Sequence, residues 1–140
     1  MQLKVKEGRV LMGRLPKGAD LLESLTDICS RKGIKLGEVR AIGAVSRARI
    51  GYYDQTERVY RFLEFNDHLE ITSLVGNVSL KDGKPFVHAH VTLADEKGSV
   101  FGGHLAEGTP IFAAEYVIRE FLSTEIPARE FDDETGLYLW

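Results

Sequence analysis

Short stretches of alternating apolar and polar residues dominate the chain and predict a mostly antiparallel β-sheet. Gln2–Leu15 alternates around Gly8, as expected for a strand. Four further stretches are rich in β-branched and aromatic residues and are separated by Gly, Asp and Asn, which is typical of strands joined by turns. These stretches are Val39–Val45, Ala48–Tyr53, Arg58–Phe65 and Leu69–Leu80. The pattern of Ile111–Leu122 fits a helix nearly as well as a strand.

One helix is predicted near the N-terminus by its capping residues and its apolar periodicity. Asp20 with Glu23 three residues later resembles a capping box, in which a side-chain oxygen accepts from a free N–H of the first turn. Gly33 is placed to end the helix. Between them, Leu21, Leu22, Leu25, Ile28 and Cys29 fall on one stripe at helical spacing. Cys29, the only cysteine, is therefore expected to be a core residue and not a nucleophile.

Residues 1–140 are expected to form one α+β domain, a mostly antiparallel sheet flanked by one or a few helices. The tail PAREFDDETGLYLW carries a turn signal and predicts a short hairpin. Hydrophobic residues make up 44% and charged residues 28%, the balance of an ordinary globular protein. The sequence has neither the apolar core of a signal peptide nor an apolar stretch that could span a membrane, so we expect a cytoplasmic protein.

The Asp82-Gly83 pair predicts how two histidines lie on a hairpin. Asp-Gly is a strong signal for a two-residue type I′ turn. This turn places Asn77 opposite His88 and Val75 opposite His90. On the other face, apolar residues meet: Val78 with Val87, Gly76 with Ala89 and Leu74 with Val91. Burial of that apolar face leaves both histidines on the opposite face.

The next loop predicts where a third histidine lies. A three-residue loop, Glu96–Gly98, is favoured because Gly98 adopts the required left-handed conformation at no steric cost. It places His104 opposite His90, whereas a two-residue loop would place it opposite Ala89, on the core face. One register therefore buries the apolar residues and gathers the three histidines on one patch.

Three imidazoles on neighbouring strand positions can supply three nitrogen ligands to a metal ion and leave a fourth position open, as in catalytic zinc sites. Such positions lie about 5–7 Å apart at Cβ, within chelating reach. His88, His90 and His104 are thus candidate ligands for a divalent metal such as zinc. Their pattern equally fits hydrogen-bonded histidines that line a cleft or a subunit interface. His68 is expected to be a solvated loop residue.

The stretch GNVSLKDGKPFVHAHVTLADEKGSVFGGHL resembles the plant and prokaryote conserved domain, called PPC or PCC, which in plants accompanies AT-hook motifs in nuclear proteins. RLPKGADLLESL, AIGAVSRARIGYYD and REFDDETGLYLW extend the resemblance over nearly the whole chain. It implies an antiparallel sheet flanked by helices, a strand through AEYVI, and a homotrimer. The family's polar positions fall here on Arg14, Glu70, Asn77, His88, His90 and His104, and we expect Arg14, Glu70 and Asn77 to line a polar cleft.

Three functions are compatible with this resemblance. The first is a DNA-associated or transcription-regulating trimer, as the family suggests. The AT-hook core Arg-Gly-Arg-Pro is absent, and 18 Lys and Arg face 21 Asp and Glu, so DNA binding by the chain alone is expected to be weak. An oligomer could still concentrate Arg40, Arg47 and Arg49 on one surface. The second is a trimer that binds a metal or small ligand through the histidines, and the third is an oligomerisation or protein-interaction module.

The sequence leaves open whether the protein is an enzyme, and it assigns no catalytic residue. It contains no nucleophile elbow, P-loop or dinucleotide fingerprint. Metal-activated water, with Glu70 as a base, would be the simplest mechanism. Strand parity counted from the Asp82-Gly83 turn places Glu70 on the core face unless a bulge intervenes.

Overall fold

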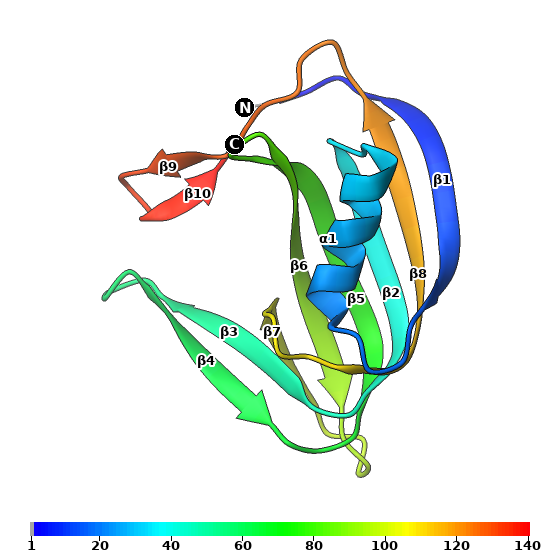
Figure 1. Ribbon diagram of the computed structural model, residues 1–140. Helices are drawn as coiled ribbons and strands as arrows, with labels where there is room; N and C mark the ends of the chain where they lie inside the picture. The colour runs from blue at the N-terminus through cyan, green and yellow to red at the C-terminus, as the bar shows by residue number, and fades with distance from the viewer. Residues whose placement is uncertain (1) are drawn as a thin grey trace.

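The computed structural model describes residues 2–140, which form one helix and ten strands (Figure 1). Eight strands make one antiparallel sheet in the order β1-β8-β2-β5-β6-β7-β3-β4, and two more form a separate hairpin. The mostly antiparallel α+β fold is therefore confirmed. In chain order, the strands are β1 Lys6–Leu15, β2 Gly37–Val45, β3 Ala48–Asp54, β4 Val59–Phe65, β5 Leu69–Lys81, β6 Lys84–Ala94, β7 Val100–Leu105, β8 Ile111–Leu122, β9 Glu130–Asp132 and β10 Leu137–Leu139.

Helix α1, Leu21–Lys32, packs across one face of the sheet (Figure 1). The Asp20 carboxylate accepts from the amide of Glu23, and Gly33 ends the helix in the left-handed conformation, as predicted. The helix buries Leu21, Leu25 and Cys29 in the core. Burial raises the pKa of the Cys29 thiol to about 12, consistent with an inert core residue. Within residues 2–140, no helix is long and apolar enough to cross a membrane.

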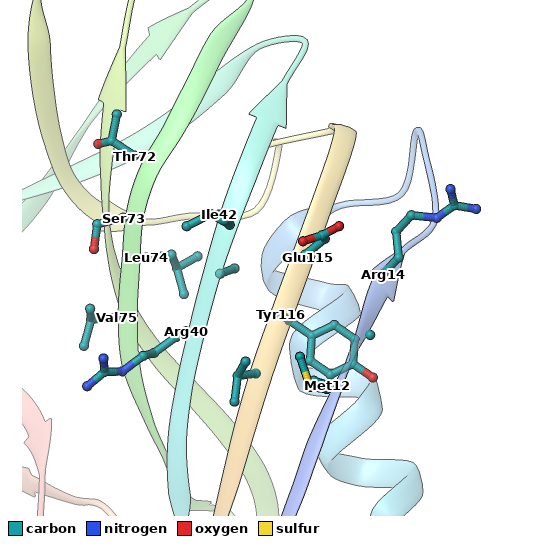
Figure 2. Close-up of a pocket in the computed structure, with 13 residues that line it drawn as sticks. Met12, Arg14, Arg40, Ile42, Thr72, Ser73, Leu74, Val75, Glu115 and Tyr116 are labelled. Atoms are coloured by element: carbon teal, nitrogen blue, oxygen red, sulfur yellow. The ribbon is translucent and has the colours of Figure 1, made fainter.

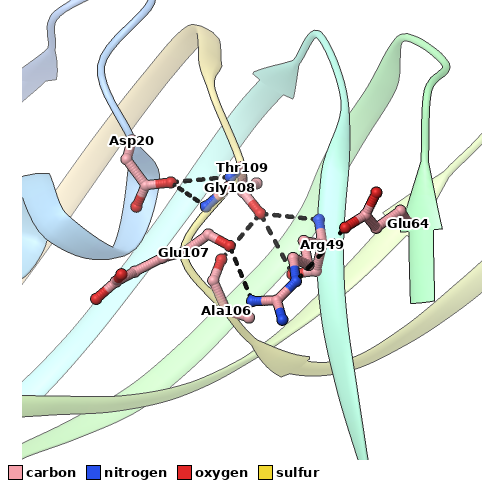
Figure 3. A network of polar contacts seen from close by, with 7 residues as sticks. All are labelled: Asp20, Arg49, Glu64, Ala106, Glu107, Gly108 and Thr109. Atoms are coloured by element: carbon pink, nitrogen blue, oxygen red, sulfur yellow. Dashed lines mark hydrogen bonds and ion pairs between the residues drawn. The ribbon is translucent and has the colours of Figure 1, made fainter. Parts of the chain in front are cut away.

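The start of α1 is tied to the sheet by a polar network around Asp20 (Figure 3). The second oxygen of the Asp20 carboxylate accepts from the amides of Gly108 and Thr109, both at 2.8 Å. The Thr109 hydroxyl accepts from the amide of Arg49 on β3 at 3.0 Å. One carboxylate thus fixes the helix start and the loop after β7, and Thr109 links that loop to β3.

The predicted hairpin registers are present. Asp82 and Gly83 both have positive φ, 51° and 73°, as a type I′ turn requires. Gly98 has a φ of 78°, and its amide donates to the carbonyl of Asp95. Both turns fix the pairing of β5, β6 and β7. Ile111–Leu122 is strand β8, as the family resemblance implied, and the tail forms the expected hairpin, β9–β10.

The sheet face opposite α1 is open and carries both apolar and charged side chains (Figure 2). Met12 is 78% exposed, Ile42 58% and Val75 52%. One cross-strand row on this face leads to two of the histidines. Its members are Met12, Val117, Arg40, Val75, His90 and His104. The histidine patch therefore adjoins a broad uncovered surface.

Candidate metal centre

Three histidines meet on the open face of the sheet, where the strand register places them. His90 on β6 pairs directly with His104 on β7, and His88 lies two residues before His90. The centroids of the three rings lie between 5.0 and 5.5 Å apart. One nitrogen from each ring can be chosen so that all three lie within 4.8 Å of one another. Three potential ligands therefore converge from two adjacent strands.

Tyr60 on β4 holds the His104 ring from the side. Its ring lies 4.9 Å from that of His104, centroid to centroid. Gly51 on β3, paired with His104, makes this approach possible. A Cβ at Gly51 would lie 3.1 Å from the Tyr60 ring and 3.5 Å from the His104 Cβ, so a larger residue would displace the tyrosine.

The surroundings favour neutral imidazoles. Burial lowers the pKa of His88 to about 4, assisted by the nearby His104, Arg129 and His90. Burial also lowers the pKa of His104 to about 4, assisted by His90 and Arg129. Both rings are therefore neutral at pH 7, and a neutral imidazole is the form that binds metal. His90 is exposed, so the site opens to solvent on its side.

One buried nitrogen of the cluster lacks a partner that a metal ion could supply. Nδ1 of His104 is buried and has no hydrogen-bond partner within residues 2–140. Buried polar atoms are normally paired, so this nitrogen needs a partner. Ligand nitrogens around tetrahedral zinc lie about 3.4 Å apart, and ring rotation can close the observed spacing of up to 4.8 Å to that value. The donor set therefore suits a metal ion.

Arg129, which sequence reasoning missed, borders the histidines. Its guanidinium donates to the Ser79 hydroxyl at 2.7 Å and to the side-chain carbonyl of Asn77 at 2.8 Å. One of its nitrogens lies 3.5 Å from Nδ1 of His88. Asn77 thus lies beside His88, as the register predicts, and is held by Arg129. No pattern in the sequence marks Arg129, because it precedes the short β9–β10 hairpin and belongs to no periodic element.

The structure does not bring Arg14 and Glu70 to the histidines. Arg14 lies on β1, which forms one edge of the sheet, and pairs there with Glu115 of β8. Glu70 pairs with Ala94 near the start of β5, and a bulge at Thr72 leaves it exposed and off the core face. Neither residue lines the cavity beside the histidines. His68 is exposed, as expected.

Comparisons with known proteins agree with this fold. Residues 2–122 match the Plants and Prokaryotes Conserved (PCC) domain. A metal-containing protein from Archaeoglobus fulgidus is 43% identical, with a TM-score of 0.94 over 100% of this chain and 98% of that one. A plant- and prokaryote-conserved (PPC) protein from Pyrococcus horikoshii is 38% identical, with a TM-score of 0.94 over 100% and 96% of the two chains.

Two further likenesses are partial or distant. The bifunctional protein GlmU of a Synechococcus strain is 35% identical over 130 residues, which cover 91% of this chain. Those residues cover 20% of GlmU, so the chain spans about a fifth of the length of the curated relatives it matches. A candidate DNA-binding protein from Bacteroides thetaiotaomicron is 22% identical, with a TM-score of 0.85 over 96% and 95% of the two chains. At that identity the likeness shows the fold alone.

Proposed function

The chain belongs to the Plants and Prokaryotes Conserved domain family, and we propose that it binds a divalent metal ion through His88, His90 and His104. The convergence of these three rings on one patch carries the proposal. The lowered pKa of two of them and the unpaired nitrogen of His104 support it, because both features suit a metal ligand. The 43% identical protein from Archaeoglobus fulgidus is described as metal-containing, which agrees with this role.

Zinc is the metal that suits this donor set best. Three neutral imidazoles are borderline-soft nitrogen ligands, and zinc tolerates a three-histidine site with a fourth position open to water or a ligand. Calcium and magnesium prefer oxygen ligands, and no carboxylate belongs to this cluster within residues 2–140.

Elemental analysis of protein purified without an affinity tag tests the proposal. We expect close to one zinc per chain in the wild type and a loss of most of it in His90→Ala. His90 is exposed, so its replacement leaves the core intact. His68→Ala removes an exposed histidine outside the cluster and is the matched control, which should keep its metal. Equal and negligible metal in all three proteins, also after incubation with zinc and dialysis, would refute the proposal.

We also propose that the chain assembles into a homotrimer. The family resemblance and the open sheet face support this assembly, because one short helix covers only one side of an eight-stranded sheet. Light scattering at micromolar concentration should give three times the monomer mass. A monomer at that concentration would exclude the trimer.

DNA association is the second candidate function. Its support is that the distant structural relative from Bacteroides thetaiotaomicron is described as a candidate DNA-binding protein. Arg40, Arg47 and Arg49, the three arginines that an oligomer could gather, do not form a free basic surface. Arg40 pairs with Glu38 at 3.4 Å, and Arg49 pairs with Glu64 at 3.7 Å. Arg47 lines a hollow together with several acidic side chains. We therefore expect binding without sequence preference and only at low salt. A nanomolar, sequence-selective shift at physiological salt would overturn this expectation.

A further inference from the structure

A cavity of about 270 Å³ lies beside the histidines. The β3–β4 hairpin lines it with Tyr53 and Tyr60, and His88 and His104 line it from β6 and β7. The C-terminal segment, which lies beyond the residues that match the family, contributes Arg129 and all of β10. The volume is just below the range of about 300–1,000 Å³ that holds drug-sized ligands, so the cavity suits a small molecule.

The charged side chains that line this cavity are all basic. Arg58, Lys81 and Arg129 contribute to its surface, and no Asp or Glu does. Within residues 2–140, none of these three cations has a carboxylate within 4.0 Å. Asp132 is close enough for Arg58 to help lower its pKa, but it does not line the cavity. The cavity therefore has a positive field, which a bound metal ion would strengthen.

Arg129 is the central cation of this cavity. It is only 6% exposed, and its guanidinium contacts only neutral groups: the Ser79 hydroxyl, the Asn77 side chain, the carbonyl of Tyr138 and, at 3.5 Å, Nδ1 of His88. These contacts use four of the five N–H groups of a guanidinium. A buried cation without an anionic partner is costly, and Arg remains charged under these conditions. The remaining N–H group is thus available to an anion in the cavity.

We propose that this cavity binds a small carboxylate anion that pairs with Arg129 and places a second oxygen on the metal ion. The proposal deepens the metal-binding function and rests on it for the second oxygen. A planar guanidinium matches a carboxylate, and the aromatic rings that line the cavity favour a ligand with a carbon skeleton. The nitrogen of Arg129 that lies 3.5 Å from His88 brings both binding groups within reach of one small molecule. A 2-hydroxycarboxylate has this combination of oxygens.

Calorimetric titration of the zinc-loaded full chain with lactate and with lactamide tests the proposal. The two probes differ in the charge of one end, so pairing with Arg129 should make lactate bind at least about tenfold more tightly. Equal affinities would overturn the proposal without any variant. Inorganic phosphate is the third probe. Phosphate that binds as tightly as lactate would show an anion site without the proposed preference for carboxylates, and would overturn that assignment.

Variants separate the two halves of the site. Arg129→Gln should keep its zinc and lose the preference for lactate, whereas Arg31→Gln, on the exposed surface of α1, should match the wild type. His90 does not line the cavity, so His90→Ala should lose zinc but keep a weaker preference for lactate that depends on Arg129. Zinc loading without any lactate preference refutes the anion cavity alone. A lactate preference without zinc loading refutes the metal site and its contact with the second oxygen.

Discussion

The buried histidines make a specific prediction about stability and pH for the metal-free protein. The pKa of both His88 and His104 is lowered to about 4, whereas an unfolded histidine titrates near about 6.5. Between these values the unfolded chain binds more protons than the folded one. The free energy of unfolding must therefore decrease as the pH falls from about 6.5 toward about 4. Above about pH 7.5 these two residues should make no contribution to its pH dependence.

The size of the effect follows from the same values. Going from pH 7 to pH 5, a shift from 6.5 to 4 corresponds to about 2 kcal/mol for each histidine. Both rings are only partly buried and are screened by solvent, so we halve the contribution of each histidine. We therefore expect about 2 kcal/mol for the two histidines together. Below this pH range, the carboxylates with lowered pKa also lose their contribution to the free energy of unfolding. These are Asp54, Asp95, Glu120 and Asp132.

Urea denaturation followed by circular dichroism, with a chelator present, measures this difference. The protein concentration must be the same at every pH, because assembly would also affect the midpoint. The double variant His88→Gln/His104→Gln should lose about 2 kcal/mol less than the wild type between pH 7 and pH 5. His68→Gln, which replaces an exposed histidine, should behave like the wild type. An equal loss in the wild type and the double variant would show that the two rings are not buried as described.

Three further predictions concern the surroundings of the site. Asp20→Ala removes the helix cap and the acceptor of the amides of residues 108–109, and should lower the free energy of unfolding by about 2–3 kcal/mol in urea denaturation, with Asp20→Asn intermediate. Cys29 should react with a thiol reagent only at the rate of unfolding, and rapid labelling of folded protein would contradict its burial. Tyr53→Phe removes the bond to the carbonyl of Thr135 at 2.7 Å, so limited proteolysis should cut the C-terminal hairpin faster at an unchanged midpoint.

The sequence predicts the histidine patch because local rules and core packing agree there. The turns at Asp82-Gly83 and Gly98 set two hairpin registers, and the same registers bury the apolar face. A slip by one residue would violate both requirements, so few alternatives remain. Ile111–Leu122 is different, because its apolar pattern fits two periods and only the family resemblance favoured a strand. Strand parity also could not place Glu70, since it depends on a bulge at Thr72 that no glycine marks.

The contributions from distant parts of the chain were beyond sequence reasoning. Arg129 reaches Asn77 from 52 residues away, and Asp20 reaches the amide of Thr109 from 89 residues away. Neither contact follows from periodicity or turn chemistry, because each depends on where a loop returns to the sheet. Arg14 and Glu70 were named from the family's polar positions, and a shared polar character does not place two residues in one site.

The site combines a rigid part with a weakly held part, and this difference has a consequence for ligand entry. The histidines lie on β6 and β7, which are paired on both sides within the sheet. The opposite side of the cavity includes a hairpin of two three-residue strands, and a hairpin of that size is marginally stable by itself. Tyr53, Arg58 and Arg129 hold this hairpin through its backbone carbonyls. Local opening of residues 130–139 should therefore cost less free energy than any rearrangement of the histidines, and we expect the proposed ligand to enter and leave on the hairpin side while the three histidines stay in place.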